Sequence, residues 1–113
     1  MKRINIEDIT WAINVEAEDM PVRGNAIASF DDETDRKYED AILADIDRGN
    51  VWAWAQVSVC GEWNGIEEWE YLGGCSYESE EDFTSDDYYD DMREEIRTRI
   101  EERARDIAKA IAD

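Results

Sequence analysis

The sequence predicts a small α+β protein in which an antiparallel sheet packs with one medium and one long helix. Apolar side chains that alternate with polar ones, or run on continuously, indicate strands. These runs lie near residues 9–16, 51–62 and 66–73. Apolar residues spaced by three and four indicate helices at residues 31–48 and 86–112. The 113 residues, 42% of them hydrophobic, suffice for one core, so we expect a single domain over residues 1–113.

The first strand and the first helix each have a local signature. Ile9, Trp11, Ile13 and Val15 alternate with smaller or polar residues, as in a half-buried strand. The helix at 31–48 begins with Ser and Asp residues suited to capping and with acids that the helix dipole favours. Gly49-Asn50 provides its end.

The strongest strand signal, residues 51–62, is followed by Asn64-Gly65, a two-residue hairpin turn. The resulting register predicts that five aromatic side chains share one face: Trp52, Trp54, Trp69, Tyr71 and Tyr77. We expect this face to be core beneath a helix, and an exposed docking patch is the alternative. The same register separates Cys60 from Cys75 by about 20 Å, so we expect free thiols.

The C-terminal part predicts two helices. Ser79-Glu80-Glu81-Asp82 resembles a capping box and starts a short helical turn. The long helix at 86–112 carries a stripe with spacings of three and four: Tyr89, Met92, Ile96, Ile100, Ala104, Ile107 and Ile111.

The charge balance restricts the kind of partner. The chain has 31 Asp and Glu against 12 Lys and Arg, a net charge of −19. Phosphate recognition needs a basic face, and anionic membranes repel such a chain, so we expect neither nucleic acid nor membrane as a direct partner. A basic protein surface, divalent ions or concentrated salt remain. The start of the chain has no apolar targeting segment, and we expect a cytoplasmic protein.

The acidic residues gather in a few segments that form the predicted partner-binding site. Three doublets at four-residue spacing begin the long helix, where they would make two carboxylate rows. Two charges per turn give about one per 2.7 Å of axis, against about one per 1.7 Å in duplex DNA. The predicted site residues are Asp31, Asp32, Glu33, Asp35, Glu80, Glu81, Asp82, Asp86, Asp87, Asp90, Asp91, Glu94 and Glu95. The structural alternative is that acids at a helix start suit the macrodipole and that Glu95–Arg99 and Glu101–Arg105 are simple i, i+4 pairs.

Residues typical of catalysis or cofactor binding are missing from the sequence. It contains no His, the commonest general base and metal ligand, and no Gly-rich phosphate loop. We therefore expect no catalytic residues, no metal site, no cofactor and no enzymatic activity.

Several segments resemble small acidic proteins encoded by phages and mobile elements: residues 21–26, 51–54, 71–77 and 88–92. The resemblance implies a mobile-element setting, in which acidic proteins of this size inhibit host enzymes as DNA mimics, as anti-CRISPR and anti-restriction proteins do. The expected partner is then a basic nucleic-acid-binding protein, a nuclease or a Cas effector. The alternatives are a halophile-adapted protein and an acidic protein-interaction module without inhibitor activity, with a homodimer as one form of the interaction module.

Overall fold

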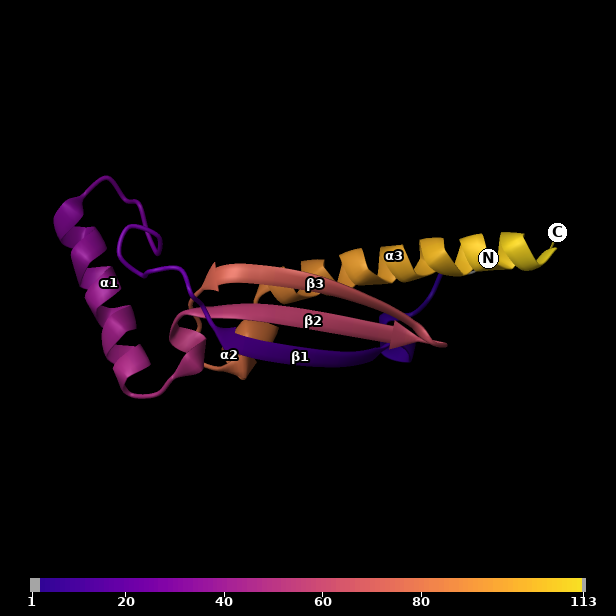
Figure 1. Ribbon diagram of the computed structural model, residues 1–113, viewed down its shortest axis with the longest axis horizontal. Coiled ribbons are helices and arrows are strands. Elements are labelled where there is room, and N and C mark those ends of the chain that lie inside the picture. The colour runs from indigo at the N-terminus through magenta and orange to yellow at the C-terminus, as the bar shows by residue number, and fades with distance from the viewer. Residues whose placement is uncertain (1–2, 113) are drawn as a thin grey trace. The chain divides into compact units, whose positions relative to one another are not determined.

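The computed structural model describes residues 3–112 and confirms the α+β class (Figure 1). Three strands form one antiparallel sheet in the order β1-β2-β3. The strands are β1 (Thr10–Ala17), β2 (Ala55–Trp63) and β3 (Ile66–Cys75). The helices are α1 (Asp32–Asp47), α2 (Glu80–Thr84) and α3 (Asp87–Ala112), with short 3-10 helices η1 (Ile6–Asp8) and η2 (Val51–Ala53).

The chain groups into two compact units. Unit 1 comprises the chain through Asn14, Ser58–Glu70, and the chain from Asp86, and it contains α3. Unit 2 comprises Val15–Val57 and Tyr71–Ser85, and it contains α1 and α2. Each strand contributes residues to both units. A single domain over residues 1–113 stays a prediction, and three of those residues lie outside the described range.

The hairpin between β2 and β3 has the turn that the sequence predicts. Asn64 and Gly65 have φ values of 49° and 83°, the positive values that a type I′ two-residue turn requires at both positions. The Glu62 carboxylate accepts a hydrogen bond from the Gly65 N–H at 2.7 Å, which fixes the loop further. Because β2 pairs with β3 across this turn and with β1 on its other edge, it is the central strand of the sheet.

The predicted strand at 51–62 is wrong over its first residues, which form η2 instead. The Asn50 side chain accepts a hydrogen bond from the Trp52 N–H at 3.1 Å and so caps this short helix. The Trp52 carbonyl accepts a hydrogen bond from the Tyr77 N–H at 2.8 Å, outside any ladder. The strand therefore begins at Ala55.

In unit 1, α3 packs directly on the sheet. Met92, Ile96 and Ile100 of the predicted stripe are buried. A Cβ at Gly61 of β2 would lie 2.7 Å from Cγ2 of Ile96, so only glycine permits this approach. The stripe loses its cover toward the C-terminus, where Ile107 and Ile111 are exposed.

In unit 2, the core is largely aromatic. The rings of Trp52 and Phe83 are stacked with centroids 5.7 Å apart, and Tyr77 meets Phe83 edge-on at 5.3 Å. Trp54 packs separately, with Val22 and Ile42.

The prediction that five aromatic side chains share one core face is wrong for two of them, Trp69 and Tyr71. Trp52 and Trp54 are buried, whereas Trp69 is 42% and Tyr71 is 70% exposed. In unit 1, α3 reaches the opposite face of β3, where Arg99 pairs with Glu70 and Arg103 lies 3.7 Å from Glu68. Trp69 alternates with these two glutamates along the strand, so its side chain points away from α3.

Candidate partner-binding site

Six predicted partner-binding carboxylates lie in unit 1, at the start of α3. They form three doublets at four-residue spacing: Asp86, Asp87, Asp90, Asp91, Glu94 and Glu95. All are exposed except Asp86, which is half-buried and accepts a hydrogen bond from the Tyr88 N–H at 3.2 Å. The six carboxylates therefore lie at the helical spacing that the sequence predicts.

Arginines of the same helix interrupt these rows. Arg93 lies 2.8 Å from Asp90, Arg97 pairs with Glu94, and Arg99 lies 3.8 Å from Glu95. Each pair joins residues three or four positions apart, the distance at which helical side chains meet. The carboxylate rows are therefore not continuous, since at least three of the six groups have a cationic neighbour.

Asp87 and Asp91 keep their charge uncompensated. Both are exposed, and neither forms an ion pair within residues 3–112. They stand one helical turn apart, about 6 Å along the axis. The nearby guanidinium of Arg93 is held by Asp90 and lies over the Tyr89 ring, 4.5 Å from its centroid. Asp87 and Asp91 are therefore two exposed carboxylates at the start of α3 that a cationic partner could contact.

A second predicted group lies in unit 2, at the start of α1, and mostly builds the helix end. Asp31 is the N-cap: it accepts hydrogen bonds from the Glu33 N–H at 3.3 Å and from the Thr34 hydroxyl at 2.5 Å. These bonds, the Thr34 bond first, lower the pKa of Asp31. Asp35 accepts hydrogen bonds from the N–H and the hydroxyl of Ser29.

The two remaining acids of this group differ in their surroundings. Glu33 has Lys37 at 3.7 Å, an exposed i, i+4 pair. Asp32 is exposed and forms no ion pair within the described chain. The group at the start of α1 thus supplies one unpartnered carboxylate and three that stabilise local structure.

The third predicted group, at α2 of unit 2, forms a variant of the capping box in which Asp82 bonds to the residue before the N-cap Ser79. The Ser79 hydroxyl accepts a hydrogen bond from the Asp82 N–H at 3.2 Å, and the Asp82 carboxylate accepts one from the Glu78 N–H at 3.0 Å. Glu80 and Glu81 are exposed and lack an ion pair in the part of the chain that is described.

The two acidic groups of unit 2 lie at opposite ends of α1. Asn50, which follows α1, donates a hydrogen bond to the Glu78 carbonyl at 3.2 Å, so α2 begins near the C-terminal end of α1. The group at Asp31–Asp35 sits at the other end of this 16-residue helix, about 24 Å away along its axis. The predicted carboxylates of unit 2 therefore form two patches.

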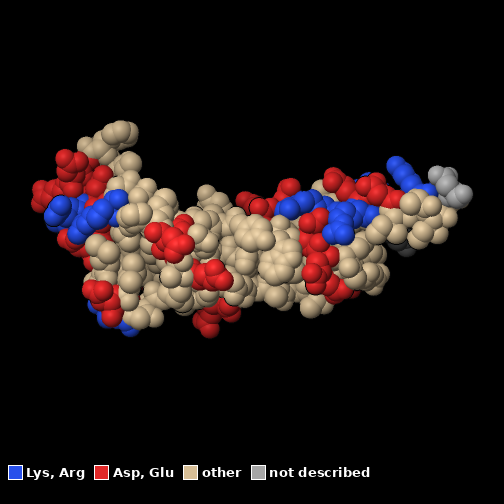
Figure 2. Space-filling model, viewed as in Figure 1, with Lys and Arg blue, Asp and Glu red and all other residues tan. Residues whose placement is uncertain are grey.

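The charge imbalance is larger in unit 2 than in unit 1. By sequence, unit 2 has fifteen carboxylates against four basic side chains, and unit 1 has sixteen against eight. Figure 2 shows the corresponding surfaces: red and blue side chains alternate over much of α3, while red side chains outnumber blue ones over α1. Both units are net acidic, and the excess in unit 2 is less compensated.

Two carboxylates that the sequence did not single out are held firmly within unit 2. Glu39 is buried, accepts a hydrogen bond from the Gly24 N–H at 2.7 Å and lies 3.1 Å from Arg23; the Gly24 bond first, then Arg23, lowers the pKa of Glu39. Glu18 accepts hydrogen bonds from the Gln56 side chain at 2.7 Å and the Gly74 N–H at 2.8 Å. Because these partners lie far away in sequence, no local pattern signals them.

The described residues offer few groups that could act as a nucleophile or bind a metal ion. Both cysteines are free thiols, and burial raises the pKa of Cys75 to about 11. Burial also raises the pKa of Cys60, with Glu67 and Glu62 contributing. Within residues 3–112, no three carboxylates or thiols come together in a way that could hold a metal ion.

Comparison with known proteins gave no match to a protein-family model, to a curated protein or to a solved structure. The resemblance to acidic proteins of phages and mobile elements therefore stays a prediction. Among residues 3–112, every helix is too short or too polar to cross a membrane.

Proposed function

We propose that this chain binds a positively charged surface of another protein through its exposed, uncompensated carboxylates. The observation that supports this is the pair Asp87 and Asp91, which stays free of ion pairs while arginines engage the carboxylates around it. Like charges one turn apart repel each other in the helix, and the helix dipole offsets this repulsion for Asp87 in the first turn. A cationic partner would remove this repulsion on binding.

The more specific form of the proposal is inhibition by nucleic-acid mimicry. The partner is then a nuclease, a Cas effector or a similar basic protein, and the carboxylates occupy the groove that normally holds phosphates. The ladder of acids on α3 supports this, although Arg93, Arg97 and Arg99 confine its uncompensated part to the first two turns. The acids of α1 and α2 add further negative charge from unit 2.

Competition with DNA tests this form of the proposal. The chain is immobilised and a host lysate is passed over it at low salt. Captured protein is then eluted with short duplex DNA at unchanged ionic strength. We expect the duplex to release a nucleic-acid-binding protein, because both ligands occupy one basic groove. Capture of a protein that salt releases and duplex DNA does not would contradict mimicry.

Adaptation to concentrated salt is the second candidate, favoured by the fifteen-to-four imbalance of unit 2 and by the presence of only three lysines. In that case the carboxylates serve hydration, and the fold depends on molar salt. An acidic interaction module without inhibitor activity would bind a basic partner, unlike a salt-adapted protein. That partner would not bind nucleic acid, unlike the target of a mimic.

A further inference from the structure

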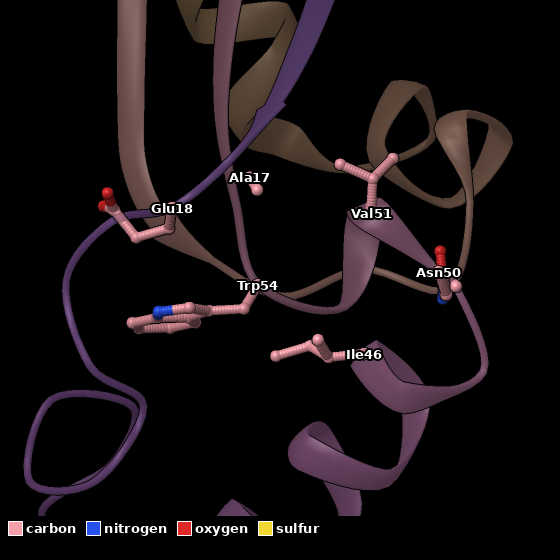
Figure 3. Close-up of a pocket in the computed structure, with 7 residues that line it drawn as sticks. Ala17, Glu18, Ile46, Asn50, Val51 and Trp54 are labelled. Carbon is pink, nitrogen blue, oxygen red and sulfur yellow. The ribbon is translucent and has the colours of Figure 1, made fainter.

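A pocket of about 260 Å³ lies within unit 2, between the end of β1, the C-terminal end of α1 and the segment that leads into β2 (Figure 3). Its lining includes Ala17, Glu18, Ile46, Asn50, Val51 and Trp54. Figure 3 shows Ile46 pointing from the end of α1 toward Trp54, while the Glu18 side chain extends away from Ile46 and Val51. The acidic surfaces described above do not account for this pocket.

The walls of the pocket are apolar and open to solvent. Ile46 and Val51 are 38% and 39% exposed, so two large aliphatic side chains remain without full cover. The polar atoms nearby are already engaged. The Trp54 indole N–H donates to the Met20 carbonyl at 2.6 Å, and the Asn50 side chain both accepts from the Trp52 N–H and donates to the Glu78 carbonyl. The interior therefore favours a hydrocarbon group.

The surroundings of the pocket are negative from three sources. Glu18 carries a carboxylate whose pKa is lowered, mainly by the Gln56 hydrogen bond, so it stays ionised at neutral pH. The C-terminal end of α1 has the negative end of the helix dipole and no basic residue in its last turn; Arg48, which follows it, pairs with Asp45. The unit itself has fifteen carboxylates against four basic side chains.

We propose that this pocket receives one lysine or arginine side chain of the basic partner. The hydrocarbon stem lies against Ile46, Val51 and Trp54, and the charged end lies at the mouth, where the C-terminal end of α1 and the carboxylates of the unit supply negative charge. Only a side chain with an apolar stem and a cationic end suits both the walls and the charge. The volume lies below the 300–1,000 Å³ usual for whole small-molecule ligands, which suits a single side chain. This inference rests on the proposed function, because it specifies how the basic partner is held.

Binding of small probes tests the pocket without the partner. The probes are the N-acetyl amides of lysine, arginine and norleucine; norleucine has the stem of lysine without its charge. Each is titrated into ¹⁵N-labelled protein while the Trp54 indole N–H signal is followed. We expect at least one of the two cationic amides to shift this signal in the millimolar range and norleucine amide to bind about tenfold more weakly. Equal binding of norleucine amide, or no shift with either cationic amide, would overturn the proposal.

Two variants locate the probe. Ala17→Leu and Val51→Phe each fill the pocket from a different element, and near-UV circular dichroism identifies the variant that keeps the fold. The folded variant should lose the shift, and unchanged binding would place the probe elsewhere and overturn the proposal. Asp87→Asn/Asp91→Asn, which alters unit 1, should bind the probe as the wild type does. If the chain captures a basic partner but its pocket binds neither cationic amide, this inference is refuted and the proposed function stands. If the pocket binds a cationic amide but the chain captures no basic partner, the proposed function is refuted.

Discussion

At the scale of single residues, Phe30 has a conformation that its own chemistry disfavours. Its φ is +68°, in the region that favours glycine, and its side chain is fully exposed. A bulky residue at positive φ is strained, and because the Phe30 ring is exposed, no hydrophobic burial offsets this strain. The bond from the Ser29 N–H to Asp35 and the cap made by Asp31 hold the segment on either side.

Replacing Phe30 with glycine should stabilise the protein. Relief of the strain at positive φ outweighs the added entropy of the unfolded chain, and we expect about 0.5–1 kcal/mol in the free energy of unfolding. Urea unfolding measures it. Phe30→Ala is the control, since it removes the ring and keeps a β-carbon at positive φ. A gain from alanine as large as that from glycine would show that the backbone is not the cause.

Glu39 should give stability a pH dependence that a single variant can isolate. Because its pKa is lowered in the folded state, the stabilisation is present above its unfolded value of 4.5 and is lost as the pH falls through the folded value. We therefore expect Glu39→Gln to lower Tm at about pH 7 and to match the wild type more closely near pH 3. Asp32→Gln, an exposed site on the same helix, is the control. A Tm difference for Glu39→Gln that stays constant over this range would contradict the assigned contacts.

At the scale of elements, local patterns predicted most of the fold. The Asn64-Gly65 turn, the capped starts of α1 and α2 and the spacing in α3 all depend on near neighbours, and the structure confirms each. Residues 51–53 were mispredicted because an apolar run looks the same in a strand and in a buried 3-10 turn. The Asn50 cap is a local contact, whereas the bond from the Tyr77 N–H to the Trp52 carbonyl joins segments that the pattern does not connect.

Gly61 should be the most sensitive small residue at the contact between β2 and α3. Gly61→Ala places a methyl group 2.7 Å from Ile96 and about 3 Å from Trp11 and Ile9, so we expect a loss of about 1–3 kcal/mol in the free energy of unfolding. A double-mutant cycle with Ile96→Ala tests the cause, because the smaller side chain makes room for the methyl group. Strictly additive effects of the two changes would mean that Ile96 is not the obstacle.

At the scale of the whole molecule, a net charge of −19 makes stability depend on salt. Added salt screens repulsion among exposed carboxylates, so we expect Tm to rise between about 0.05 and 1 M potassium chloride while the chain stays folded at the lower end. Circular dichroism at each concentration measures both. A chain that unfolds without molar salt would favour the halophile alternative over partner binding.

The sequence predicts where the acidic residues of the candidate site lie, but only partly which of them stay without a cationic partner. The sequence places the acids of residues 87–95 on α3 correctly, because helical periodicity fixes their spacing. It does not reveal that the Arg93 guanidinium lies over the Tyr89 ring, or that Asp35 accepts hydrogen bonds from Ser29. Which carboxylates stay uncompensated depends on side-chain contacts, and the pocket beside Trp54 depends on segments that are distant in sequence.

The central claim is that Asp87 and Asp91 present uncompensated charge to a basic partner. The most direct measurement is the dissociation constant of the captured partner for three proteins: wild type, Asp87→Asn/Asp91→Asn and Glu102→Gln/Asp106→Asn. The last is a matched control, with two exposed acids of the same helix, the same four-residue spacing and the same change in charge. We predict about tenfold or more weaker binding for the first pair and little change for the control. Equal losses for both pairs, or none for Asp87 and Asp91, would contradict the claim.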